Sequence, residues 1–168
     1  MKSEPYPQTS GQCGLCLFAP ETDSQIDRVG EIGDSMGADW FSFVGNNPDI
    51  VVESIPTFHS KSIEKFKQLS PYPDVTGIVG IDSARMVEDI ADENIDTEYL
   101  PSYSHQVHES YVFIPDSKFS VKLYNEVDNF VVVPSTGPLS LEELVAVGLY
   151  DRLVAGKDDP GGEENGGS

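Results

Sequence analysis

The sequence predicts a single α/β domain in which parallel β-α-β units form a mixed sheet, followed by an antiparallel meander and a C-terminal helix. Apolar runs of strand length alternate with helical periodicity in the first half of the chain, which is typical of β-α-β units. Short apolar runs with brief connections fill the second half, which favours antiparallel pairing. A length of 168 residues suits one domain. We expect residues 13–155 to form it, with a flexible N-terminal arm over 1–12 and a disordered acidic tail over 156–168.

The first elements are a strand, a helix and a second strand. Residues 15–19 form a short apolar run that predicts the first strand. A helix follows over 21–37, with Thr22 as N-cap and Gln25 three residues later, the spacing of a capping box. Residues 39–45 mix aromatic and polar side chains and predict the second strand.

The next four elements repeat this alternation. Residues 50–55 predict a strand that ends at Pro56, and residues 58–69 predict an amphipathic helix. The β-rich run 75–81 predicts a central strand, because it is apolar on both faces. A helix over 83–93 follows directly.

After residue 95 the period changes to that of strands. A short strand is predicted over 96–100, followed by three more over 110–114, 119–124 and 129–133. Residues 119–123 alternate apolar and polar side chains, which indicates a strand with one solvated face. The short connections predict that these strands form the antiparallel meander.

The last predicted element is a helix from about Ser140 to Val154. Ser140 and Glu143 have the spacing of a capping box. Leu141, Leu144 and further apolar residues at helical spacing form its buried stripe.

Charge is the strongest feature of the composition. The chain has 29 Asp and Glu against 10 Lys and Arg, giving a formal net charge of −19. Such a surface repels nucleic acid, so we expect no direct nucleic-acid partner. Acidic residues spread over the whole domain also favour a halophilic, archaeal source. No apolar leader or membrane-spanning run occurs, and with only two cysteines the expected location is the cytoplasm.

Four residues form the candidate metal site. Cys13 and Cys16 form a C-x-x-C, and His105 and His108 form an H-x-x-H, so a Cys₂His₂ zinc site is the alternative to no cofactor at all. Redox chemistry is disfavoured because the cysteines lead into a strand and not into a helix N-terminus. The simplest interpretation is that Cys16 is buried in the first strand and that Cys13 lies in the preceding loop.

Four other residues form a candidate ligand site. Asp82 and Ser83 follow the central strand, where open α/β sheets bind ligands, although they are also ordinary helix-capping residues. Tyr103 and Tyr111 flank the histidines in a polar, aromatic patch.

The order of elements from residue 49 onward resembles a known family. The chain resembles the ligand-sensing domain of archaeal winged-helix transcriptional regulators, whose fold is similar to half of a phospholipase D. The resemblance is carried by "DIVVESIPTFHSKSIEKFKQL", "VTGIVGIDSARMVEDI", "IDTEYLPSY", "ESYVFIPDSKFSVKLYNEVDNFVVV" and "ELVAVGLYDRLV". It implies a sensor without catalytic activity. The phospholipase motif is incomplete here, since Phe66 stands where an acidic residue would follow His59 and Lys61.

These observations together predict a non-enzymatic, intracellular, regulatory domain. It would bind a small molecule or a protein partner, or form a homodimer through the sheet edge or the last helix. The alternative is a metal-dependent enzyme or zinc-stabilised protein that uses the Cys₂His₂ set.

Overall fold

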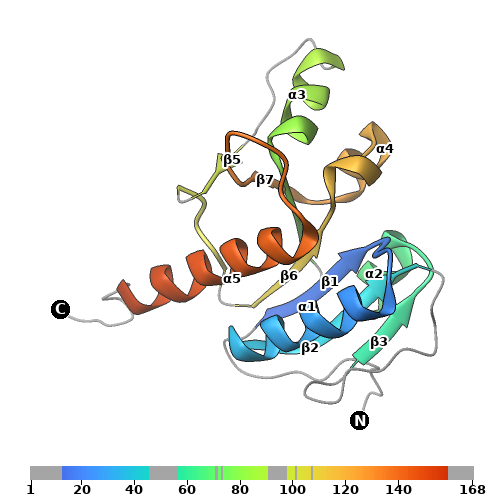
Figure 1. The fold of residues 1–168 in the computed structure, drawn as a ribbon, viewed down its shortest axis with the longest axis vertical. Coiled ribbons are helices and arrows are strands. Elements are labelled where there is room, and N and C mark those ends of the chain that lie inside the picture. Colours follow the sequence, from blue (N-terminus) through green and yellow to red (C-terminus); the bar gives the residue numbers. More distant parts are fainter. Residues whose placement is uncertain are drawn as a thin grey trace.

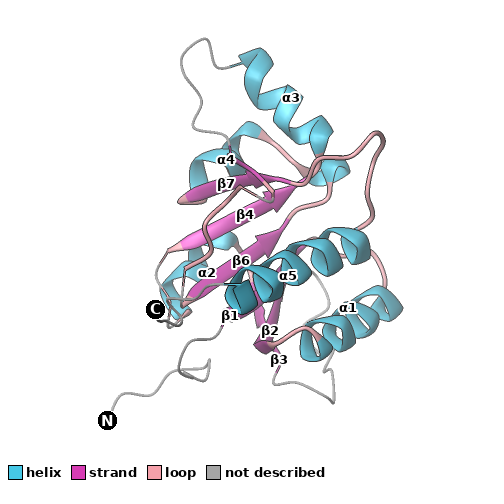
Figure 2. Ribbon diagram, turned by 90° about the vertical axis from the view of Figure 1, so that its left-hand side faces the viewer, coloured by secondary structure: helices cyan, strands magenta, loops and turns pink. Residues whose placement is uncertain are grey.

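The computed structural model describes residues 13–45, 57–70, 72, 74–90, 98–100, 102–106 and 108–158. Its strands form one seven-stranded sheet in the order β3-β2-β1-β6-β4-β7-β5, and every pairing is parallel (Figures 1 and 2). The strands are β1 (Cys13–Phe18), β2 (Ala38–Val44), β3 (Thr57–Ser60), β4 (Val75–Val79), β5 (Glu98–Tyr99), β6 (Glu109–Phe113) and β7 (Asn129–Val132). The helices are α1 (Asp23–Ser35), α2 (Ile63–Leu69), α3 (Ile81–Ile90), α4 (Val121–Glu126) and α5 (Leu141–Asp158).

The α/β class is confirmed, and the early elements lie where the sequence places them. The Oγ1 of Thr22 accepts the backbone N–H of Gln25 at 3.1 Å, so this N-cap begins α1 as predicted. The predicted arm and the strand over 50–55 lie outside the described residues. So does the predicted tail after residue 158, whereas residues 156–158 belong to α5.

One predicted helix begins later than expected. Residues 57–60 form β3, which pairs with β2, although residues 58–60 were included in the helix predicted over 58–69. The helix begins only after Ser62, whose Oγ accepts the N–H of Lys65 at 3.1 Å. A cap inside an amphipathic run therefore sets this boundary.

The antiparallel meander is wrong. Residues 119–124 do not form a strand, because Ser120 caps helix α4 by accepting the N–H of Leu123 at 3.4 Å. Phe119 and Leu123, four residues apart, are 7% and 6% exposed, so the spacing that resembled strand alternation also fits one helical face. Helix α4 connects β6 to β7, so the chain can cross back and β7 can run parallel to β4. The sheet formed by the described strands is therefore parallel and not mixed.

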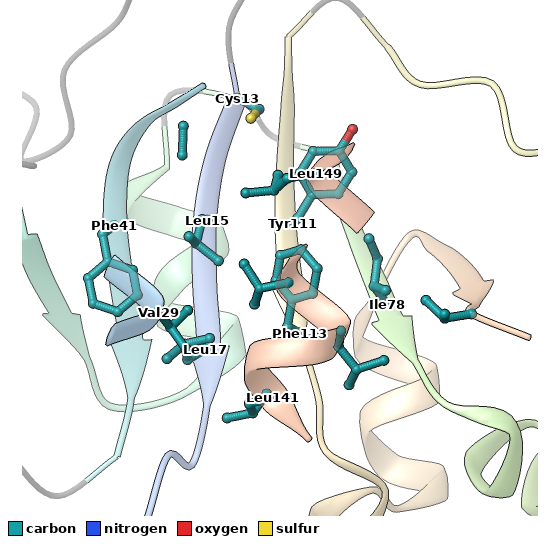
Figure 3. Packing of buried hydrophobic residues seen from close by; sticks show 14 of the residues in the cluster. Cys13, Leu15, Leu17, Val29, Phe41, Ile78, Tyr111, Phe113, Leu141 and Leu149 are labelled. Atoms are coloured by element: carbon teal, nitrogen blue, oxygen red, sulfur yellow. The ribbon is translucent and has the colours of Figure 1, made fainter. Parts of the chain in front are cut away.

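Helices cover both faces of the sheet and create two cores. Figure 2 shows α1 and α5 side by side on one face, where Ile26, Val29, Leu141 and Leu149 pack on the strands. Helices α2, α3 and α4 pack on the other face, around Trp40. Figure 3 shows the first core, in which α5 packs across Leu15, Tyr111 and Phe113.

Helix α5 begins at the predicted capping box. The Oγ of Ser140 accepts the N–H of Glu143 at 3.1 Å, and the carboxylate of Glu143 accepts the N–H of Ser140 at 2.9 Å. Its outer face carries the exposed apolar side chains of Val147, Tyr150 and Leu153. Among the residues that the structure describes, no helix combines the length and the apolar character needed to cross a membrane.

Candidate functional site

A cavity of about 250 Å³ lies at the carboxyl ends of the strands. Strands β2 and β3 lie on one side of β1, and strands β6, β4, β7 and β5 lie on its other side. In open α/β sheets, ligands bind outside the carboxyl ends at such a reversal of strand order. The cavity is lined from the segment after β1, the segment after β6 and the start of α5: Ala19, Glu21, Gln25, Pro115, Asp116, Ser117, Pro138, Leu139, Ser140 and Leu141.

Asp116 joins two of the carboxyl-end segments. Its Oδ1 accepts the backbone N–H of Ser83 at 3.0 Å and also the hydroxyl of Ser83. Ser83 is buried in the first turn of α3, so the carboxylate ties the segment after β6 to the start of that helix. Its Oδ2 is buried and has no hydrogen-bond partner in the described part of the chain.

Gly80 makes room for this carboxylate. A Cβ atom at this position would lie 2.5 Å from Oδ2 of Asp116, closer than real contacts allow. Only glycine therefore lets the Asp116 side chain approach the end of β4.

The surroundings of the cavity are acidic. Glu21 and Asp116 line the cavity itself. A neighbouring groove of about 420 Å³ shares Glu21 and Gln25 with it and adds acidic side chains from α1 and α5, with Arg28 as its basic residue. The Nε2 of Gln25 donates to the carboxylate of Glu142 at 3.3 Å and links the two helices. A cavity of this charge attracts a cationic ligand.

The four predicted ligand residues do not form one site. Ser83 contacts Asp116 beside the cavity, whereas Asp82 is exposed and faces Arg85 at 3.4 Å. Tyr103 and Tyr111 lie at the opposite, amino end of the sheet: the hydroxyl of Tyr103 lies 3.1 Å from the hydroxyl of Thr76, near the start of β4.

The four candidate zinc ligands are separated by the sheet itself. Cys13 and Cys16 belong to different cores, because residues three apart on a strand point to opposite faces. His105 bonds Tyr111 in the first core, whereas the ring of His108 stacks on Tyr72, which belongs to the second core. Within the described ranges, no group of three or more His, Cys, Asp or Glu is arranged to hold a metal.

Burial also makes the two thiols weaker acids. It raises the pKa of the Cys13 thiol to about 11, and it raises the pKa of the Cys16 thiol as well. The thiolate is the nucleophilic form, so both cysteines are unreactive thiols near neutral pH.

The fold was compared with proteins of known structure. No protein-family model matches the chain, and no curated protein matches its sequence. The SpoU methyltransferase AviRb from Streptomyces viridochromogenes, solved with AdoMet, superimposes with a TM-score of 0.66 at 13% identity. That match covers 92% of this chain and 61% of AviRb.

Two further structures agree with this match. An rRNA methyltransferase from Sinorhizobium meliloti gives a TM-score of 0.63 at 14% identity, covering 88% of this chain and 56% of that one. A structure that describes 2-OH methylation of C/U34 on tRNA gives 0.63 at 14% identity, covering 86% of this chain and 96% of that one. The chain therefore shares the fold of these three methyltransferase structures. It spans less than two thirds of the length of the first two proteins.

These structures correct the functional interpretation of the sequence. The phospholipase-D-like sensor is wrong, because the structures whose fold matches this chain are described as methyltransferases. The prediction of a non-enzymatic regulatory domain without a nucleic-acid partner is contradicted, since the similar structures are described as RNA-modifying enzymes. The prediction of no cofactor, with zinc as the alternative, is contradicted, because the similar structure of AviRb was solved with AdoMet. The halophilic, archaeal source is unsupported by these comparisons.

Sequence reasoning missed Asp116 and the segment 134–140. Asp116 lies in the Pro-Asp-Ser segment 115–117 that follows β6. The segment 134–140, which follows β7, is rich in Pro and Ser, so both have the composition of a connection at a sheet edge. The prediction of a strand over residues 119–124 concealed that these two segments lie at the same edge of the sheet. Once these form a helix, β6 and β7 are parallel, and their carboxyl ends fall on the same edge.

Proposed function

We propose that this protein is an AdoMet-dependent methyltransferase that binds AdoMet in the carboxyl-end cavity and acts on RNA. The observation that carries the proposal is the position of the cavity. It lies at the reversal of strand order, in a fold that AviRb shares while holding AdoMet. The descriptions of the similar structures support RNA as the class of acceptor.

The charge of the cavity fits this cofactor. AdoMet carries a sulfonium and an ammonium against one carboxylate, so it has a net positive charge. Glu21 and Asp116 are the acidic side chains among the lining residues, and no basic residue is among them. The carboxylate of Asp116 places a negative charge beside the cavity, which favours a cationic ligand.

The chain's own residues would bind and orient the cofactor. Bound AdoMet supplies an electrophilic methyl group. Asp116 keeps the segments after β4 and β6 together through Ser83. The capping box at Ser140 fixes the start of α5, which forms another wall of the cavity.

A steric block of the cavity tests the proposal. Ser117 is exposed and lines the cavity, so Ser117→Trp should fill it without disturbing the core. Ser35 is exposed in the last turn of α1, away from the cavity, and Ser35→Trp is the matched control. By isothermal titration, we expect AdoMet to bind the wild type and Ser35→Trp, and to bind Ser117→Trp at least about tenfold more weakly, equivalent to 1.4 kcal/mol.

Methyl transfer is measured separately, with radiolabelled AdoMet and total RNA as acceptor. We expect label in RNA with the wild type and Ser35→Trp and a loss of label with Ser117→Trp. Binding of AdoMet without transfer to RNA would contradict the acceptor class. A failure of the wild type to bind AdoMet, or equal binding by both tryptophan variants, would contradict the cofactor site.

A further inference from the structure

A buried polar network lies at the amino end of the sheet, opposite the proposed cofactor site. Its centre is Glu109, the first residue of β6, whose side chain is 0% exposed. The last turns of α5 contribute Asp151 and Arg152 to it, and the segment before β6 contributes His105. Figure 3 shows Tyr111, whose hydroxyl oxygen (red) belongs to this network, close to Leu149 of α5. The proposed function uses none of these groups.

Glu109 accepts hydrogen bonds on both carboxylate oxygens. Oε1 accepts the backbone N–H of Gln106 at 2.8 Å and the hydroxyl of Tyr111 at 2.8 Å. Oε2 accepts the hydroxyls of Thr76 and Tyr103. An ionised carboxylate at Glu109 can accept all four of these hydrogen bonds.

The Tyr111 oxygen must then accept its other hydrogen bonds. Its single proton is donated to Glu109. Nη1 of Arg152 donates to the same oxygen at 2.9 Å, and Nδ1 of His105 lies 2.6 Å from it. The Nδ1 contact is a hydrogen bond only if Nδ1 carries a proton.

The second ring nitrogen of His105 needs a proton as well. Its Nε2 lies 2.7 Å from Oδ2 of Asp151, an acceptor when ionised. Both nitrogens therefore donate, and the ring is an imidazolium. The negative charges of Glu109 and Asp151 then balance the positive charges of His105 and Arg152. This balance explains how four ionisable groups share a buried site.

We propose that His105 is held as an imidazolium, and that its extra proton fixes the end of α5 and the segment before β6 to the sheet. Loss of that proton would remove one of the two hydrogen bonds of the ring and leave the network with an excess negative charge. Among the described residues, His105 contacts Tyr111 of β6, Asp151 of α5 and the ring of Tyr103. Glu109 and Arg152 contact Tyr111 in turn, and both act electrostatically on Cys13 of β1. The inference does not depend on cofactor binding.

Side-chain ¹⁵N NMR of the full chain tests the protonation directly. The chain has three histidines, so His59→Gln and His108→Gln assign the remaining ring by elimination without altering the network. At pH 7.5 we expect both ring nitrogens of His105 to carry protons. A neutral tautomer of His105 at this pH would overturn the proposal.

The pH dependence of unfolding is the second readout. An unfolded histidine loses its proton near pH 6.5, so the folded state binds one more proton above that value. A charged His105 in the folded state should make the unfolding constant of the wild type rise with pH above about pH 6.5. His108→Gln should keep this dependence and the isosteric Asp151→Asn should weaken it. Equal dependence in wild type and Asp151→Asn would contradict the proposed role of the proton.

Discussion

Single glycines show how closely parts of this chain approach one another. A Cβ at Gly14 on β1 would lie 1.9 Å from an indole carbon of Trp40 on the neighbouring β2. A Cβ at Gly80 would collide with the carboxylate of Asp116. The first glycine allows the only tryptophan to lie flat on the strand, and the second allows a charged group beside the candidate site.

We expect Gly14→Ala to destabilise the protein by about 3 kcal/mol, at the upper end of the usual cost of overpacking a core. The indole cannot move away, because Trp40 is fully buried against Phe66 and Tyr72. Denaturant unfolding followed by Trp40 fluorescence measures the change. Gly137→Ala is the control, since nothing lies within 4 Å of a Cβ at that position. Equal free energies of unfolding for the two variants would contradict the prediction, because they would show that β1 and β2 shift to accept the added methyl group.

At the scale of elements, caps decide where helices begin. Thr22, Ser62, Ser120 and Ser140 each accept the N–H three residues ahead. Two of these caps were visible in the sequence, because Thr22 and Ser140 stand before long amphipathic stretches. Ser120 stands before six helical residues, too few for the helical period to distinguish them from a strand.

Ser140→Ala should lower the free energy of unfolding by about 1 kcal/mol, the usual cost of losing an N-cap. The N–H of Glu143 then loses its side-chain acceptor at the start of α5. Chemical denaturation monitored by circular dichroism measures the effect. Ser104→Ala, an exposed position outside the helices and strands, should change stability by less than about 0.5 kcal/mol. A loss in Ser104→Ala as large as in Ser140→Ala would contradict the capping role.

At the scale of the whole molecule, the two ends of the parallel sheet differ. The carboxyl end holds an open acidic cavity, as expected of a ligand site in this architecture. The amino end is closed by hydrogen-bonded side chains that burial keeps in fixed protonation states. Burial raises the pKa of the Tyr103 and Tyr111 hydroxyls, and Glu109 raises them further.

The raised pKa values of the two buried thiols predict that the protein becomes less stable at alkaline pH. Unfolded cysteines ionise near pH 8.5, whereas burial raises the pKa of folded Cys13 to about 11 and also raises that of Cys16. The folded state therefore binds more protons above pH 8.5, and stability falls as pH rises toward 11. Each thiol contributes at most about 1.4 kcal/mol per pH unit. Denaturant unfolding between pH 8.5 and 10 should show a smaller decline in Cys13→Ala/Cys16→Ala. An unchanged decline would exclude the thiols as its source.

Much of the fold could be predicted from local patterns. The run around Leu15–Leu17, the cap at Thr22 and the capping box at Ser140 each identify an element within a few residues. The candidate site could not be predicted in the same way. Asp116 and Ser83 are 33 residues apart and meet only because β6 inserts beside β4. Strand order is a long-range property that no local period encodes.

The sequence by itself determined the α/β class, the course of α1 and α5, and the acidic charge of the molecule. These follow from hydrophobic period, capping residues and composition, all of which act over short distances. Only the tertiary structure decided that β7 is parallel, that Cys13 and Cys16 lie on opposite faces, and that His105 joins Asp151 and Tyr111. The physical reason is that pairing across the sheet selects partners by burial and hydrogen bonding between distant segments, which removes the predicted metal set and creates the cavity around Asp116.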